Sequence, residues 1–285
     1  MERQRKRISE MAPEKRDAMR EKWRMWARKR REEVESDDSS SSSMTTHFDE
    51  EDQSVRKIQL EKQDISMPVY SVMGVATENR TRHTPLLPNS IRCVMCATSN
   101  GGKTNLMLNL LYSRQGLKFE NIYLFSKTLH QPQYNQLSNI LSTLPEIGFY
   151  KYGNSDDVPI PSETMSNSIM ILDDTARDKQ DRIRMFFSMG RHNHIDSFYL
   201  AQSYCRIPKH LIRDCANLII VFRQDTLNMR KIYDDHVNVD MSFNKFSDMC
   251  SICWENTQYG FLVIDKECSL FSGRYRQGCD TFIIP

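Results

Sequence analysis

The sequence predicts an α/β fold in which a mainly parallel β-sheet is flanked by helices. Short, wholly apolar runs recur along the chain with helical stretches between several of them, which is typical of parallel strands buried on both faces. Near residues 91–111 an apolar run, a glycine-rich turn and a helix-forming stretch follow one another directly. That order is the context in which phosphate-binding loops occur, so it predicts a P-loop type of α/β core.

Each expected element follows from such a run. The apolar runs expected to form strands are Ile91–Cys96, Ile122–Phe125, Ile169–Leu172, Phe198–Leu200, Leu218–Phe222 and Phe261–Ile264. The stretches expected to form helices are Asn105–Ser113, Arg177–Met189 and Asn228–His236. The sequence shows no internal repeat. At 285 residues the chain has room for one large domain or two small ones.

Charge divides the chain into three parts. Residues 1–31 hold 13 Lys or Arg against 5 Asp or Glu, a net of +8, and residues 32–52 hold 9 acids without any Lys or Arg. We therefore expect a basic arm over residues 1–35, disordered or helical, that is either simply solvated or binds DNA or an acidic partner. An acidic low-complexity linker should follow over 36–55, and a packed domain over 56–285. That domain is only mildly basic, so binding of nucleic acid would need a local patch.

The sequence also indicates the cellular compartment in which the protein is expected. No apolar run reaches the roughly 18 residues that a membrane-spanning helix needs, so no membrane association is expected. The chain opens with Met-Glu-Arg-Gln-Arg-Lys-Arg and no apolar segment follows, which is unlike a secretory signal. The expectation is an intracellular, non-secreted protein whose 8 cysteines stay reduced.

The glycine-rich turn reads Ala97-Thr98-Ser99-Asn100-Gly101-Gly102-Lys103-Thr104, a phosphate-binding loop with alanine where the first glycine is usual. Backbone N–H groups of such a loop converge on phosphate oxygens at the positive end of a helix. Lys103 would reach the β- and γ-phosphates of ATP, and Thr104 would ligate Mg²⁺. Alanine at 97 would cost about 1 kcal/mol if that position needs a positive φ. The residues expected to contact the nucleotide are Ser99, Asn100, Gly101, Gly102, Lys103, Thr104 and Asn105.

Two later strands end in polar residues suited to the same site. The run from Ser168 ends in Asp173 and Asp174, where phosphoryl-transfer ATPases place the acid that faces Mg²⁺. Asp173 would hold Mg²⁺ through water and Asp174 would orient or deprotonate the attacking water, unless the pair is an ordinary turn. The strand Ser197–Ala201 is followed by Gln202, whose amide could contact the γ-phosphate or position water.

The stretch after Gly190 resembles a known superfamily. Gly190-Arg191-His192, Tyr199-Leu200-Ala201-Gln202-Ser203-Tyr204, residues 207–214, residues 217–222 and Tyr259–Asp265 look like the FtsK–HerA superfamily. The resemblance covers roughly residues 85–265. It is closest to the viral genome-packaging branch that includes poxvirus-type ATPases, and within it to the ATPases of Maverick/Polinton elements and adintovirus-like viruses.

The resemblance implies a RecA-like core and a DNA-translocating ATPase. It implies a ring, a hexamer in this superfamily, that pumps double-stranded DNA without sequence preference into a capsid and meets a capsid or portal-vertex protein. The implied place of action is the nucleus or a viral assembly site in a eukaryotic host. Ring ATPases commonly use a cation from the neighbouring subunit. Arg191 and Arg213 are the candidates for this trans role, followed by Arg223, with a surface ion pair as the alternative for each.

Two other functions stay open at this point. One is a DNA pump that serves transposition or DNA transfer, and the other is a decayed nucleotide-binding module of a domesticated element, which only Ala97 favours.

Cysteine and histidine pairs give weaker signals. Cys93 and Cys96 should point to opposite faces of one strand and so cannot share a metal. Cys250 and Cys253, with Cys268 and Cys279 downstream, are a zinc candidate whose spacing lacks a second short pair. His192 and His194 could form a metal pair, but one histidine bonded near the nucleotide and one exposed fits better.

Overall fold

The computed structural model describes residues 82–255 and 259–285, all of which fall in one compact unit. The predicted arm and linker, and the start of the predicted packed domain, lie outside the described residues. Within the described part, no helix is both long enough and apolar enough to cross a membrane.

A nine-stranded sheet organises the described residues, in the order β3-β2-β4-β5-β1-β6-β7-β8-β9. The pairs from β3 to β6 are parallel, and the pairs from β6 to β9 are antiparallel. The strands are β1 (Arg92–Cys96), β2 (Asn121–Ser126), β3 (Gly148–Tyr152), β4 (Ser168–Asp173), β5 (Ile195–Ala201), β6 (Leu218–Phe222), β7 (Phe261–Asp265), β8 (Tyr275–Gln277) and β9 (Thr281–Ile283).

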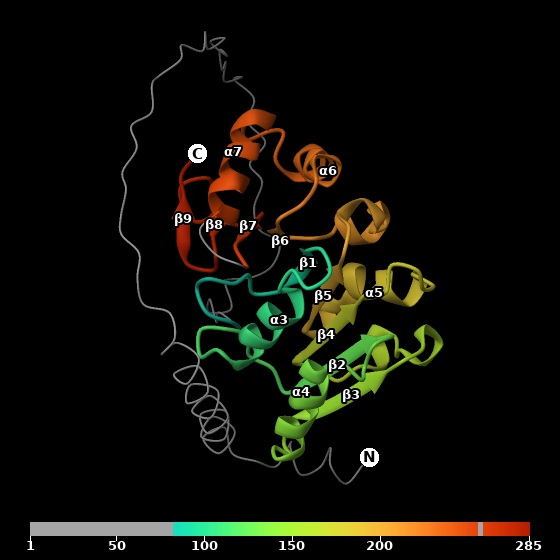
Figure 1. Cartoon of the computed structure of the whole chain (residues 1–285). Helices are drawn as coiled ribbons and strands as arrows, with labels where there is room; N and C mark the ends of the chain where they lie inside the picture. Colours follow the sequence, from blue (N-terminus) through green and yellow to red (C-terminus); the bar gives the residue numbers. More distant parts are fainter. Residues whose placement is uncertain (1–81, 256–258) are drawn as a thin grey trace, which may run out of the picture. The chain divides into compact units, whose positions relative to one another are not determined.

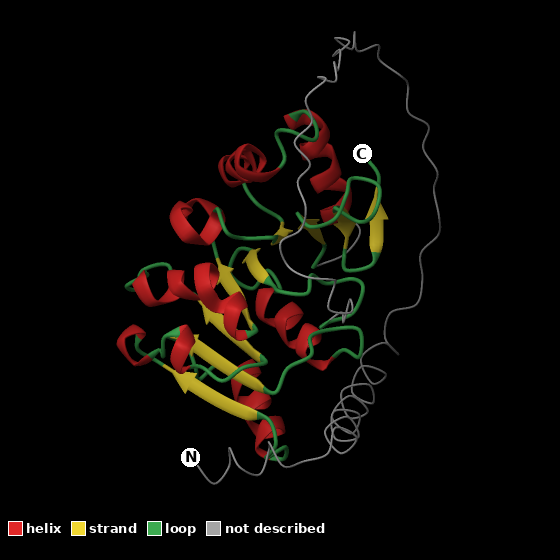
Figure 2. Ribbon diagram, turned by 180° about the vertical axis from the view of Figure 1, so that it is seen from behind, coloured by secondary structure: helices red, strands yellow, loops and turns green. Residues whose placement is uncertain are grey.

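Helices cover both faces of this sheet (Figures 1 and 2). One face is packed by side chains of α3 (Lys103–Tyr112) and α4 (Pro132–Ser142). The other is packed by α5 (Asp181–Met189), α6 (Thr226–His236) and α7 (Phe243–Glu255). The predicted α/β core of the RecA-like P-loop NTPase type, with its mainly parallel sheet flanked by helices, is thereby confirmed.

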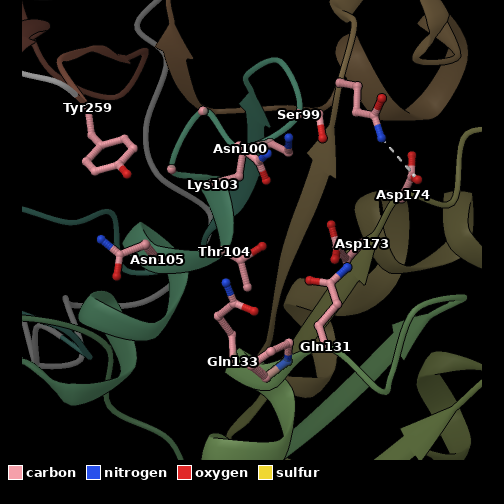
Figure 3. Close-up of a pocket in the computed structure, with 14 residues that line it drawn as sticks. Ser99, Asn100, Lys103, Thr104, Asn105, Gln131, Gln133, Asp173, Asp174 and Tyr259 are labelled. Carbon is pink, nitrogen blue, oxygen red and sulfur yellow. Dashed lines mark hydrogen bonds between the residues drawn. The ribbon is translucent and has the colours of Figure 1, made fainter.

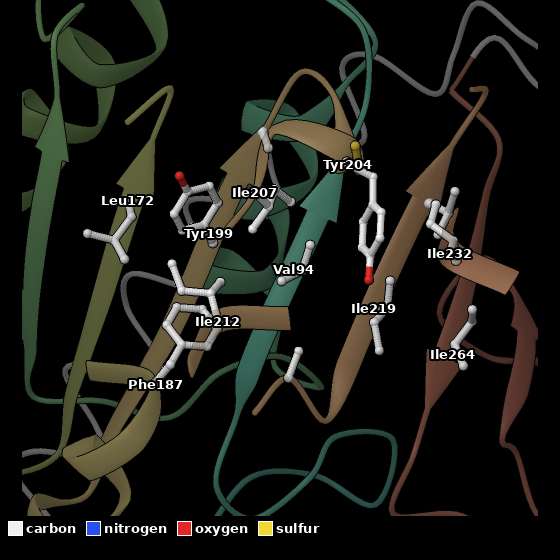
Figure 4. Close-up of a cluster of buried hydrophobic side chains, with 14 of the residues drawn as sticks. Val94, Leu172, Phe187, Tyr199, Tyr204, Ile207, Ile212, Ile219, Ile232 and Ile264 are labelled. Atoms are coloured by element: carbon white, nitrogen blue, oxygen red, sulfur yellow. The ribbon is translucent and has the colours of Figure 1, made fainter. Parts of the chain in front are cut away.

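Successive side chains of β1 lie on opposite faces of the sheet, so this strand contributes to two apolar clusters. Val94 and Cys96 belong to the apolar cluster under α5, α6 and α7, whereas Cys93 and Met95 belong to the cluster under α3 and α4. Figure 4 shows Val94 in the first cluster with Tyr199 of β5 and Ile219 of β6. Cys93 and Cys96 therefore do lie on opposite faces, as predicted, because successive side chains of a strand alternate.

All six predicted strands and the three predicted helices are present, and apart from short 3-10 and π turns the described residues form five further strands and α-helices that no apolar run predicts. These elements are β3, α4, α7, β8 and β9. β3 is an edge strand without a fully buried residue, so it lacks a continuous apolar stretch. Helix α5 begins at Asp181 and not at Arg177, because the segment before it is a loop in which the Gln180 side chain donates to the carbonyls of Thr175 and Asp178.

The cysteines are all free thiols. Cys250 and Cys253 lie on the buried face of α7 and contact the apolar core. Among residues 82–255 and 259–285 no group of three His, Cys, Asp or Glu side chains is placed to hold a metal ion.

Candidate nucleotide-binding site

The order of the central strands brings the predicted motifs to one edge of the sheet. β5 lies between β1 and β4 and is parallel to both, with Cys96 opposite Ala201 and Asp173 opposite Leu200. Two backbone bonds continue this register past the strand ends. Ala97 N–H donates to the Ala201 carbonyl at 3.1 Å, and Asp174 N–H donates to the Leu200 carbonyl at 3.1 Å. The loop after β1, the acids after β4 and the amide after β5 therefore meet at the carboxyl edge.

The loop after β1 has the backbone that its glycines permit. Gly102, at the start of α3, has a φ of 97°, a value that strongly favours glycine. A Cβ at Gly101 would lie 2.9 Å from the Ala97 Cβ and 3.0 Å from the Thr98 carbonyl oxygen, so this turn is too tight for a side chain. The N–H groups of the first turn of α3 thus open onto the edge of the sheet, where an anion is stabilised by the helix end.

The expected cost of Ala97 is not observed. Ala97 is not among the described residues with positive φ, and its side chain is fully buried in the apolar cluster under α3 and α4. The methyl group therefore fills space beside Gly101 without backbone strain. The sequence-based concern that this residue distorts the loop is corrected by the structure.

Lys103 is held close to the loop. Its ammonium donates to the carbonyls of Ala97 at 2.7 Å and Thr98 at 3.1 Å, and only 8% of the residue is exposed. Burial lowers the pKa of Lys103, and the nearby Asp173 carboxylate opposes that shift. A lysine ammonium has three N–H donors, so a donor remains beyond these two bonds for a phosphate oxygen.

Asp173 at the end of β4 is buried and receives a short hydrogen bond. The hydroxyl of Tyr134, from α4, donates to Asp173 Oδ2 at 2.6 Å, and it is also hydrogen-bonded with Thr104. Burial raises the pKa of Asp173, whereas the Tyr134 bond and the Lys103 charge act in the opposite direction. Tyr134 thereby joins the two side chains predicted to hold Mg²⁺.

Asp174 and Gln202 are brought together across the sheet edge. Gln202 Nε2 donates to Asp174 Oδ2 at 3.1 Å, and both side chains are exposed at the site. Asp174 has a φ of 54°, in the left-handed region that Asp and Asn tolerate better than most residues. The turn after β4 thus aims the second carboxylate away from the buried first one and toward Gln202.

A cavity of about 750 Å³ connects these groups. Figure 3 shows the side chains that line it. All seven loop residues predicted to contact a nucleotide line it, together with Asp173, Asp174 and Gln202. Its volume falls within the range of small-molecule and cofactor sites. The remaining lining residues, which the sequence did not single out, are Gln131, Pro132, Gln133 and Tyr259.

The predicted arginines do not line this cavity. Arg191 is exposed before β5, at the amino edge of the sheet and opposite the loop, and His192 and His194 lie there with it. The expectation that one of these histidines lies near the nucleotide of its own subunit is wrong for that reason. Arg213 is buried, pairs with Asp235 at 2.6 Å and lies over the Tyr204 ring. Arg223 is exposed directly after β6, on the same edge as the loop.

The donor set suits a hard divalent cation. Mg²⁺ prefers oxygen ligands and keeps several waters, so one or two protein oxygens beside substrate phosphates suffice. Thr104 and Asp173 supply such oxygens, and the Tyr134 hydroxyl already bridges them. The residues present therefore fit the predicted ion.

Comparisons with known proteins give structural likenesses only. No protein-family model and no curated protein matches the chain. The genome-packaging NTPase B204 of Sulfolobus turreted icosahedral virus 2 in complex with ATP-gammaS is 14% identical with a TM-score of 0.46, covering 69% of this chain and 100% of that one. Its complex with AMP is 15% identical with a TM-score of 0.45, covering 64% and 95%. The N-terminal domain of zonular occludens toxin from Neisseria meningitidis is 14% identical with a TM-score of 0.31, covering 48% and 79%. These values do not bear on activity.

Proposed function

We propose that this protein is a Mg²⁺-dependent ATPase that translocates double-stranded DNA, and that its task is to package a viral genome into a capsid. The observation that carries the ATPase part is the convergence of Lys103, Asp173 and the Asp174–Gln202 pair on one cavity. Three strands that are separate in sequence place these groups side by side. An ordinary Asp-Asp turn would not need a phosphate loop and an amide beside it.

Each residue has a defined task in this proposal. The α3 end and Lys103 bind the phosphates and offset their charge as it moves to the leaving oxygen. Thr104 and Asp173 would hold Mg²⁺, which supplies further charge neutralisation when bound. Asp174 accepts a hydrogen bond from the attacking water, orients it toward the γ-phosphate and takes its proton as the new P–O bond forms. Gln202 fixes the Asp174 carboxylate by the bond already present.

Translocation of DNA, assembly into a ring and delivery to a capsid or portal-vertex protein rest on the FtsK–HerA resemblance. Ring ATPases commonly use a cation from the next subunit at the transferring phosphate. Arg191 is exposed on the edge opposite the subunit's own loop, which suits a residue that acts on a neighbour. Arg213 has an intramolecular partner in Asp235, and Arg223 lies beside its own loop. We therefore rank Arg191 first for the trans role.

The decisive experiment compares hydrolysis by the wild-type protein and Lys103→Ala, with and without long duplex DNA at low salt. The expected result is Mg²⁺-dependent turnover that rises with DNA and is lost in the variant. Contact with the phosphate backbone of DNA predicts that the stimulation of hydrolysis by DNA falls steeply as salt rises and does not depend on the DNA sequence. Turnover that does not change when duplex DNA is added would contradict DNA translocation. Turnover in Lys103→Ala equal to that of wild type would contradict the proposed ATP-binding site.

The trans role has its own test. Arg191→Ala subunits mixed with Lys103→Ala subunits should complement each other at mixed interfaces and restore part of the turnover that either lacks alone. If Arg191→Ala alone hydrolyses ATP at the wild-type rate, Arg191 is not the finger.

A catalytically decayed module is no longer favoured, because the only feature behind that alternative was Ala97, and it shows no strain. A DNA pump for transposition or transfer uses the same site. Translocation of duplex DNA into capsids of the same element, reconstituted in vitro, would separate packaging from that task.

A further inference from the structure

We propose that Tyr259 is the platform on which the base of a bound nucleoside triphosphate stacks. This inference rests on the proposed nucleotide site and adds the subsite for the base, which the phosphate-binding residues leave undefined. It concerns the side of the cavity away from the catalytic acids.

The order of the strands gives the cavity a direction. The acids follow β4 and the amide follows β5, and both strands lie on one side of β1. A γ-phosphate must face Asp174 for water to attack it there. The phosphate chain therefore runs across the loop, and the nucleoside end emerges on the other side of β1, toward β6 and β7.

Tyr259 is the aromatic residue that lines the cavity on that side. It precedes β7, and Figure 3 shows it beside Asn105 and Lys103, away from Asp173 and Asp174. The side chain is half-exposed, with 43% of the residue accessible, so a ring surface faces the cavity.

The ring is also supported from behind. A Cβ at Gly102 would lie 3.0 Å from Tyr259 Cδ1 and 3.2 Å from Phe222 Cε1, which means that the tyrosine packs against the loop glycine. Phe222 pairs in turn with Phe261 at a centroid distance of 5.2 Å. This contact with Gly102 sets the ring next to the start of α3, at the position that a nucleoside attached to the bound phosphates would reach.

Stacking on an aromatic ring is available to every base, because each base has a π-face. Tyr259 should therefore increase the affinity for ATP and GTP alike, and contribute nothing to a ligand without a base. That difference separates a base platform from a ring that merely shapes the phosphate loop.

The test measures dissociation constants of the full chain for ATP, GTP and inorganic tripolyphosphate by calorimetry. We expect Tyr259→Ala to weaken ATP and GTP binding about 5- to 100-fold, and to leave tripolyphosphate within about twofold of wild type. Tyr259→Phe keeps the ring and should bind all three ligands within about threefold of wild type. Phe271→Ala removes an aromatic side chain that is 74% exposed and does not line the cavity, so it is a matched control without effect.

Two outcomes overturn the inference. Equal losses for ATP and tripolyphosphate would mean that the ring only shapes the loop, and unchanged ATP binding would mean that the base lies elsewhere. Either result leaves the proposed ATPase intact if Lys103→Ala still loses hydrolysis. A wild-type protein that binds neither ATP nor tripolyphosphate would refute the nucleotide site itself, and the base platform with it.

Discussion

Removing the Tyr134 hydroxyl isolates the group that links the two proposed Mg²⁺ ligands. Tyr134→Phe deletes one oxygen from a residue that is 2% exposed and keeps the ring in the core under α3 and α4. The Asp173 carboxylate then loses a 2.6 Å donor in a site where it is only 5% exposed. The variant tests whether Tyr134 acts through Asp173 or only fills space.

The expected magnitude follows from the chemistry of that bond. A hydrogen bond to a charged group contributes about 1.5–3 kcal/mol, and loss of a partner behind a metal ligand typically costs about 10- to 100-fold in metal affinity. The Mg²⁺ concentration for half-maximal hydrolysis should therefore rise about 10- to 100-fold. Because the Tyr134 bond favours the ionised carboxylate, its loss raises the pKa of Asp173 further. The acid limb of the pH–rate profile should move to higher pH.

The assay is a Mg²⁺ titration of ATP hydrolysis, paired with ATP binding in chelator. Tyr233→Phe is the matched control, because it also deletes a hydroxyl that donates a hydrogen bond, to the Met241 carbonyl at 3.0 Å and outside the cavity. Metal-free ATP binding should stay unchanged in both variants. If Tyr134→Phe keeps the wild-type Mg²⁺ requirement and pH profile, the positioning role of Tyr134 is refuted.

Three further substitutions follow from the same geometry. Burial raises the pKa of Asp173, so the folded state binds that proton more tightly than the unfolded chain, and stability falls as pH rises between the ordinary and the raised pKa. Asp173→Asn should therefore have a higher free energy of unfolding than wild type at about pH 8, and a smaller advantage at about pH 4, when both are unfolded in urea. The same variant should lose hydrolysis. A variant less stable than wild type at the higher pH would contradict this reasoning. Gly102→Ala forces a side chain onto a φ of 97° and against Tyr259, so ATP affinity in calorimetry should drop about tenfold, and an unchanged affinity would sink the strain argument. Ala97→Gly should lower the free energy of unfolding by about 0.5–1 kcal/mol without raising turnover. A variant that hydrolyses ATP severalfold faster than wild type would show that the alanine does impair the phosphate-binding loop.

Sequence patterns were sufficient for the parts of the fold that depend on burial. Strands β1, β2, β4, β5 and β6 are buried throughout or nearly so, and continuous apolar runs mark them plainly. Because parallel strands end at one edge, the sequence alone places the expected phosphate loop, the acids and Gln202 together.

Residues contributed by unpredicted elements could not be found in this way. Tyr134 belongs to α4, which has no continuous apolar run because its buried residues Tyr134, Leu137 and the adjacent Ile140 and Leu141 are separated by Gln, Asn and Ser. Two local signals of this helix are present in the sequence, the helical spacing of those apolar residues and Pro132 at the first turn, where proline is favoured. The bond from Tyr134 to Asp173 joins residues 39 positions apart, so only tertiary packing reveals it.

The environment of the predicted arginines could not be read from the sequence either. Arg213 looks like an available cation in sequence, yet packing gives it Asp235 and Tyr204 as partners. Ala97 looked like a defect because the usual residue is glycine, yet its backbone is not in the left-handed region. Local sequence cannot report φ at a turn or the partner of a charge.

The most direct test of the central claim is single-turnover hydrolysis of ATP by Asp174→Asn. Asparagine keeps the size of the side chain and tolerates the left-handed backbone at this position, so the loop and Lys103 should still bind ATP with wild-type affinity. The amide cannot accept a proton from water, so the hydrolysis step should slow about 100-fold or more. Hydrolysis within about twofold of wild type, at equal ATP occupancy, would contradict the assignment of Asp174 and with it the proposed site.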